Sequence, residues 1–138
     1  MSKRPLPPSK LPADTLRQLR QAYIDLVGFV PPRIEARTDL LARVDPDGLH
    51  LQEQARRHFM YPACFDTKTS QLMLFGMLLV QLADAARLHA IAARREGASW
   101  DELSAVVGLA FLFRGLSAAN LGSEILQGIA KEEATSTS

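Results

Sequence analysis

Apolar residues recur along most of this chain at spacings of three and four residues, which is the spacing of one face of an α-helix. Near the start, Leu16, Leu19, Tyr23 and Leu26 follow it. The strict alternation that marks a half-buried strand is absent over any useful length. We therefore predict an all-α fold of about six to seven helices. Six of the predicted helices cover residues 13–29, 34–44, 45–60, 66–82, 99–113 and 117–130. Another runs from a break near residues 81–84 to residue 96.

Capping residues and glycines mark several helix ends. Asp45-Pro46 reads as a helix start, because aspartate caps and proline fits the first turn. Ser99 and Glu102 have the spacing of a capping box, in which each side chain bonds the other residue's backbone N–H. Gly97 follows the preceding helix as a candidate left-handed cap.

The helix over residues 66–82 is apolar around nearly its whole circumference. It contains the run LMLFGMLLV at residues 72–80, which is far shorter than the roughly 20 residues that span a bilayer. A helix that is apolar all round and too short for a membrane is typical of a protein core. The pattern therefore predicts a buried central helix.

Composition supports this fold and sets its limits. Leucine and alanine dominate over the β-branched residues, which favours helices. With 138 residues, 47% of them hydrophobic, and a net charge of +1, the chain fits one domain with a real core. We expect a flexible Pro-rich arm over residues 1–12, a domain over 13–131 and a disordered tail over 132–138. The even charge argues against nucleic-acid binding. No secretory signal is apparent, so we expect a soluble cytoplasmic protein.

Few residues of this chain are suited to catalysis. The sequence has three histidines, one cysteine (Cys64), and none of the HExxH, CxxC, P-loop or GxGxxG motifs. A single cysteine excludes dithiol chemistry and a cysteine zinc site within one chain. His89 shares a helical face with Leu82, Ala85, Ala92 and Ala93. It either bonds a backbone carbonyl in a packed core or lines a small pocket.

Three further polar residues are candidates for a binding site. His58 and Tyr61 lie one helical turn apart, so their side chains either meet on one face or reach water at a helix end. Arg114 ends an apolar helix. There it either complements the helix dipole or holds a carboxylate with its bidentate guanidinium group.

The segment from Asp66 to Leu126 resembles the carboxymuconolactone decarboxylase family, which includes the AhpD-like alkylhydroperoxidases. The order is Asp-x-Lys-Thr, an apolar helix, a histidine, Ala-Ala-x-x-x-Gly-Ala-Ser, an acidic pair, a second apolar helix and Gly-x-x-Ala-Ala. Together with the upstream Gly28-Phe29-Val30-Pro31, the resemblance covers about three quarters of the chain. It implies an AhpD-like helical fold, no cofactor or metal, and a homo-oligomer, commonly a trimer or hexamer.

The same resemblance separates two branches of the family. Peroxidase members carry Cys-x-x-Cys followed by a histidine, and a proton-relay glutamate. The histidine falls on His89, the two cysteines on Leu82 and Ala85, and the glutamate on Ser70. Peroxide reduction needs a thiolate, which leucine and alanine do not supply. The chain is therefore more similar to the decarboxylase branch, which acts on small carboxylated lactones from aromatic ring cleavage.

Three hypotheses follow for the function. The first is a cofactor-independent lyase or isomerase with His89 as general acid/base, Arg114 on the substrate carboxylate, and Ser70, His58 and Tyr61 lining the pocket. The second is a residual redox role, close to the family's peroxidase activity, through Cys64. The third is a non-enzymatic, oligomeric small-ligand-binding protein, because a fold does not fix a function.

Overall fold

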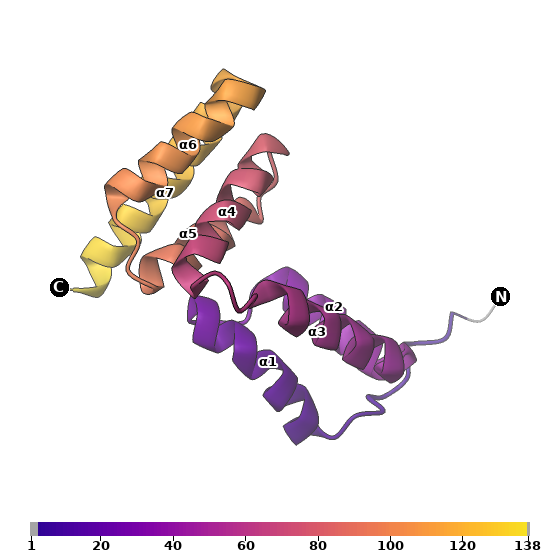
Figure 1. Ribbon diagram of the computed structural model, residues 1–138. Coiled ribbons are helices and arrows are strands. Elements are labelled where there is room, and N and C mark those ends of the chain that lie inside the picture. The colour runs from indigo at the N-terminus through magenta and orange to yellow at the C-terminus, as the bar shows by residue number, and fades with distance from the viewer. Residues whose placement is uncertain (1–2, 138) are drawn as a thin grey trace. The chain divides into compact units, whose positions relative to one another are not determined.

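A computed structural model describes residues 3–137, and all the regular structure within that range is helical. The predicted all-α fold of six to seven helices is confirmed, with helix ends shifted by a few residues (Figure 1). The seven helices are α1 (Ala13–Val27), α2 (Pro32–Val44), α3 (Pro46–Met60), α4 (Thr67–Val80), α5 (Ala86–Arg95), α6 (Trp100–Arg114) and α7 (Leu116–Ser136).

These helices belong to two compact units. Unit 1 ends at Pro62 and holds α1 to α3, whereas unit 2 starts at Ala63 and holds α4 to α7. The domain predicted over residues 13–131 includes helices of both units. Each unit has its own packing.

The predicted helix starts are made by the expected side chains. Asp45 accepts a hydrogen bond from the backbone N–H of Gly48 at 2.9 Å, and so caps α3. Both bonds of the capping box between Ser99 and Glu102 are present at the start of α6. Gly97, two residues after α5, has a φ of +93°, a conformation that side-chain-bearing residues rarely adopt. The capping predictions are therefore confirmed.

A buried polar network ties the three helices of unit 1 together. The Tyr23 hydroxyl on α1 donates to Glu53 Oε1 on α3 at 2.7 Å. Arg37 on α2 donates to the same carboxylate oxygen at 2.6 Å and to the Tyr23 hydroxyl oxygen at 2.9 Å. Tyr23 and Glu53 are 4% and 5% exposed. Because each helix supplies one member, the network fixes their relative placement.

Tyr23 is shielded on its ring face as well. The Arg56 guanidinium lies 4.1 Å from the centroid of the Tyr23 ring, a cation–π contact from α3. Burial, together with the hydrogen bond to Glu53, raises the pKa of the Tyr23 hydroxyl to about 12. The hydroxyl therefore stays protonated, and donates to Glu53, at neutral pH.

Two hydrogen bonds anchor the N-terminal arm on α2. The Lys10 backbone N–H donates to the Ala42 carbonyl at 2.8 Å, and the Arg43 guanidinium donates to the Pro7 carbonyl at 3.0 Å. The described part of the arm, residues 3–12, is non-helical and mostly exposed. The Pro-rich composition explains the lack of a helix, because proline has no N–H to donate.

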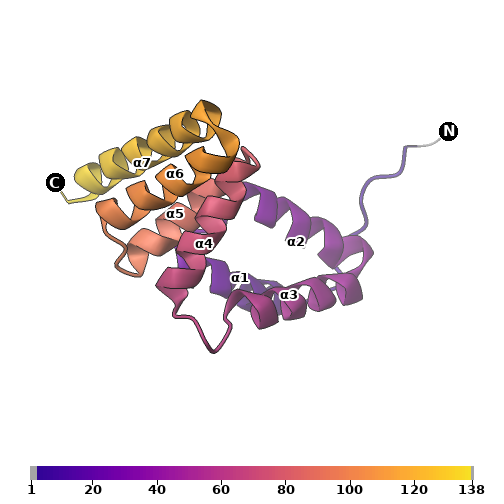
Figure 2. The same cartoon turned by 45° about the horizontal axis from the view of Figure 1, so that its top comes forward.

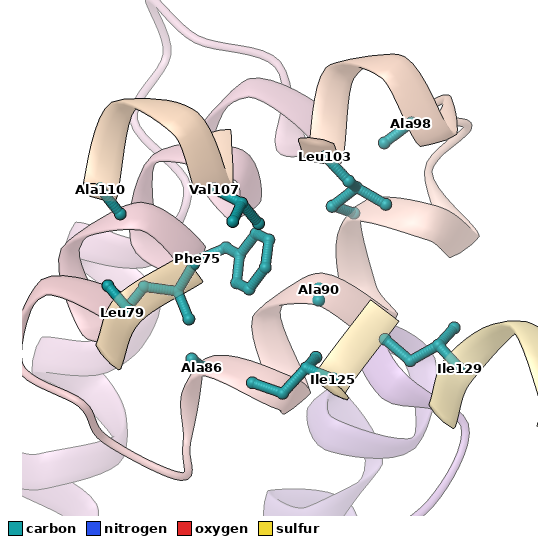
Figure 3. Packing of buried hydrophobic residues seen from close by; sticks show 12 residues of the cluster. Phe75, Leu79, Ala86, Ala90, Ala98, Leu103, Val107, Ala110, Ile125 and Ile129 are labelled. Carbon is teal, nitrogen blue, oxygen red and sulfur yellow. The ribbon is translucent and has the colours of Figure 1, made fainter. Parts of the chain in front are cut away.

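Unit 2 is built on an apolar core to which all four of its helices contribute (Figure 3). The ring of Phe75 points into the middle of the cluster, beside Val107. On α5 the core positions are alanines, which let that helix approach α4 closely. The largest members are Phe75 and Leu79 from α4, Leu103 and Val107 from α6, and Ile125 and Ile129 from α7.

α6 and α7 run side by side as an antiparallel hairpin (Figure 2). The turn between them is at Gly115, where φ is +84°. Gly122 on α7 makes the close approach possible. A Cβ atom at that position would lie only 2.7 Å from Val107 Cγ2 and 3.2 Å from Leu79 Cδ1. Any larger residue there would push α7 away from α4 and α6.

α4 and α6 lie parallel and in contact. The Lys68 ammonium, near the start of α4, donates to Glu102 at 2.9 Å near the start of α6. Further along, a Cβ atom at Gly76 would lie 3.0 Å from Val106 Cγ1. The backbone of Gly76 is therefore level with that of Val106.

α7 continues to Ser136, through residues for which the sequence predicts a disordered tail. Two arginines of α5 account for the difference. Arg94 makes a bidentate ion pair with Glu133, with N–O distances of 2.9 and 2.8 Å, and Arg87 pairs with Glu132. These contacts depend on the crossing of two helices and cannot be read from the local sequence.

The prediction that the apolar helix is a buried central helix holds for only one side of α4. Phe75 and Leu79 are fully buried, but Met73 and Met77 are 44% and 54% exposed. Among the described residues, no helix combines the length and the apolar character needed to cross a bilayer. Because Met73 and Met77 lie on it, the exposed side of α4 is an apolar surface of unit 2.

Candidate functional site

His89, the predicted acid/base, is held by a side chain of the neighbouring helix. Its Nδ1 lies 2.7 Å from Oε1 of Gln71, so α5 and α4 are joined at this point. An amide oxygen only accepts hydrogen bonds, so Nδ1 carries a proton, and in the neutral ring Nε2 then carries the lone pair. Gln71 is fully buried, whereas His89 is partly exposed. The ring is therefore fixed in one orientation and one tautomer.

This contact adds no charge beside the imidazole. The Gln71 amide is neutral, so it orients the His89 ring through a hydrogen bond only at this point. An oriented imidazole is a common general acid/base, because it can accept a proton and return it. His89 is therefore a candidate general acid/base.

Ser70 is next to Gln71 in the chain and is also buried, at 8% exposure. Its Oγ has no hydrogen-bond partner among residues 3–137. A buried hydroxyl is usually satisfied by a protein group or by an ordered water. Ser70 lines none of the three cavities described below, so its role in a pocket stays a prediction.

Sequence reasoning missed Gln71, although it has a signal. It is the last polar side chain before the nine apolar residues 72–80. A polar residue on a helix that is predicted to be buried needs a hydrogen-bonding partner. The sequence does not say which residue that partner is, and only the packing of α4 on α5 selects His89.

The structure does not bring Arg114 to His89. Gln71 lies five residues before Gly76, and Arg114 lies eight residues after Val106, with which Gly76 is level. At 1.5 Å per residue, the backbones of Gln71 and Arg114 are about 20 Å apart along the parallel helices. The exposed Arg114 side chain ends α6, where it complements the helix dipole. Within one copy it is therefore too distant to hold the carboxylate of a small ligand at His89.

His58 and Tyr61 belong to unit 1, whereas Ser70 and His89 belong to unit 2. The His58 ring packs edge-on against Phe59, with centroids 4.8 Å apart. His58 also lines a surface depression of about 340 Å³ along α3. Tyr61 directly follows α3 and is 40% exposed. Their predicted role in a pocket with His89 remains a prediction.

The positions aligned with the peroxidase cysteines lie in the turn between α4 and α5. Leu82 has a left-handed backbone with a φ of +54°, and Ala85 directly precedes α5. Cys64 is exposed in the segment before α4. Over the described range, no three or more histidine, cysteine, aspartate or glutamate side chains gather as a metal ion would need.

Two cavities of unit 2 are lined by neither His89 nor Gln71. A groove of about 390 Å³ runs between α4 and α6, and its lining is almost wholly apolar. A second hollow of about 400 Å³ lies between Trp100 and α7. His89 lines neither of them. A ligand at His89 would therefore occupy a separate place.

Comparison with known proteins adds no identification. No protein-family model, no curated protein and no solved structure matches this chain.

Proposed function

We propose that this protein is a cofactor-independent lyase that acts on a small carboxylated lactone or a related product of aromatic ring cleavage. The resemblance of residues 66–126 to the carboxymuconolactone decarboxylase family suggests the reaction class. The absence of cysteine at Leu82 and Ala85 argues against the peroxidase alternative.

The observation that carries the proposal is the hydrogen bond between His89 Nδ1 and Gln71 Oε1. When Nδ1 donates this bond from a neutral ring, Nε2 is the basic nitrogen of the imidazole. When the carboxylate of a substrate leaves as carbon dioxide, the electron pair of the broken bond stays on carbon. Protonated His89 would donate its Nε2 proton to that carbon. The neutral ring that results would then take up a new proton from the solvent.

Replacement of His89 with alanine tests the proposal. We expect kcat/KM on a carboxylated muconolactone to fall by about 10²–10⁴-fold, the usual contribution of a general acid/base. The assay follows the loss of substrate absorbance together with carbon dioxide release. His50→Ala is the matched control, since His50 is exposed on α3 and has no proposed role. Equal turnover by the wild type and His89→Ala would remove His89 from the mechanism.

A second candidate is a non-enzymatic, oligomeric ligand-binding protein. The specific observation in its favour is that the groove between α4 and α6 is apolar and is not lined by His89. Under this alternative, the wild type would turn over none of the carboxylated lactones tested. The same assay therefore separates the two candidates.

The resemblance also supports a homo-oligomer, a trimer or a hexamer, and we propose separately that the protein is cytoplasmic. These remain proposals, and they concern the assembly and location of the protein more than its chemistry.

A further inference from the structure

Unit 2 exposes large apolar side chains along the outer side of α4 and α6. The most exposed are Met73, Met77, Leu109, Leu112 and Phe113, at 44%, 54%, 62%, 71% and 86%. We call this set the α4/α6 face. All of these except Leu112 also line the 390 Å³ groove between the two helices, and Leu112 lies one helical turn from Leu109. The apolar groove between α4 and α6 and the exposed apolar side chains of the α4/α6 face are thus adjacent.

The face carries no charge. The chain has no charged residue between Lys68 and Asp84, and none between Glu102 and Arg114. Lys68 and Glu102 pair with each other at one end of the face. Helices that are apolar all round are normally buried on all sides. In one copy of this chain, α4 and α6 are buried only on their inner sides.

We propose that a second copy of this chain covers the α4/α6 face, with the same face used by both copies. Five side chains of this size and exposure amount to roughly 700 Å² of apolar surface, close to the 800 Å² or so that each partner contributes to a stable interface. Monomeric proteins rarely expose a contiguous apolar patch of that extent.

The shape of the face fits a two-fold contact. Among residues 3–137, Phe113 is the most exposed large apolar residue, and it lines the groove. A two-fold rotation would place Phe113 of each copy over the groove of the other, so that one patch serves as both partners. A neutral face pairs with itself without repulsion, whereas an anionic lipid surface would be expected to need several basic side chains at its rim.

The inference rests on the proposed homo-oligomer and favours its hexamer over its trimer, because a two-fold contact gives an even number of chains. It names the contact face and does not depend on chemistry at His89. Sedimentation velocity of the full chain at micromolar concentration tests it. We expect an even multiple of 15.2 kDa for the wild type. For Leu109→Glu and Phe113→Glu we expect 15.2 kDa or a species halved in mass, with unchanged helical circular dichroism. Leu51→Glu is the matched control, because Leu51 is exposed on α3 to the same extent, 66% against 62% for Leu109.

Several results would overturn the inference. They are a wild type with the mass of one or three chains, folded Leu109→Glu and Phe113→Glu proteins that stay fully assembled, or dissociation by Leu51→Glu alone. If the wild type is monomeric, a fluorescent apolar dye and neutral lipid vesicles identify the occupant. Binding of either that is lost in Leu109→Glu would assign the face to a small apolar ligand or to lipid. The mass measurement requires no turnover, so the failure of this inference and the failure of the lyase proposal are distinguishable.

Discussion

Truncation of Phe75 to alanine is expected to lower the free energy of unfolding by about 3–5 kcal/mol, a large part of the stability of a small domain. Phe75 is fully buried at the centre of the unit 2 core, among side chains from α5, α6 and α7 (Figure 3). The loss has two parts: the transfer free energy of the ring and the cavity that rigid neighbours leave open. Urea denaturation followed by far-UV circular dichroism measures it.

Phe59→Ala is the matched control for this prediction. Phe59 is the same residue type on another helix, but it is 78% exposed. We expect its free energy of unfolding to stay within about 0.5 kcal/mol of the wild-type value. Equal losses in the two variants would show that Phe75 does not have the buried position described.

Removal of the Glu53 carboxylate is expected to cost about 3 kcal/mol or more, because it leaves buried polar partners without an acceptor. In Glu53→Ala the Tyr23 hydroxyl loses its acceptor, and Arg37 loses the carboxylate that its guanidinium contacts at 2.6 Å. Glu35→Ala removes an exposed carboxylate from α2 and serves as the control. If both variants unfold at the same urea concentration, the network does not stabilise unit 1.

The same network predicts an alkaline limit to stability. The folded chain holds the Tyr23 proton more tightly than the unfolded chain does, since the pKa of Tyr23 is raised from 10.0 to about 12. This contribution is therefore complete below pH 10 and is lost as the pH rises through about 12. In Tyr23→Phe, the fall in unfolding free energy between pH 10 and 12 should be smaller than in the wild type. A fall of the same size would contradict the assignment.

Local signals in the sequence account for most of the fold. Asp45, Ser99 with Glu102, and Gly97 each work through neighbours within four residues, so their caps were predictable. The C-terminal end of α7 and the network of Tyr23, Arg37 and Glu53 were not predictable. Both depend on side chains from helices far apart in the chain, and one sequence does not state which helices cross.

The candidate site was predictable only in part. His89 was found from its place on an alanine-rich helical face, but its partner Gln71 lies 18 residues away on α4. Arg114 was interpreted either as a partner of the helix dipole or as a carboxylate clamp, because its residue type suits both roles. The parallel register of α4 and α6 places the backbone of Arg114 about 20 Å from that of Gln71, a distance that residue type does not reveal.

The apolar helix 66–82 shows a further limit. Its composition predicts that all its sides avoid water, but composition does not say what covers each side. Phe75 and Leu79 are covered by this chain, whereas Met73 and Met77 are not. The interpretation as a central helix therefore becomes an expectation about the assembled protein.

The central claim is that Gln71 orients His89 so that Nε2 is the basic nitrogen. Long-range proton–nitrogen correlation spectra of the ¹⁵N-labelled protein test it most directly, at a pH where the ring is neutral, with His89 assigned by its absence in His89→Gln. We expect a protonated Nδ1 and an unprotonated Nε2, and a mixture of tautomers in Gln71→Ala that matches exposed His50. A wild-type His89 that carries its proton on Nε2 would contradict the account.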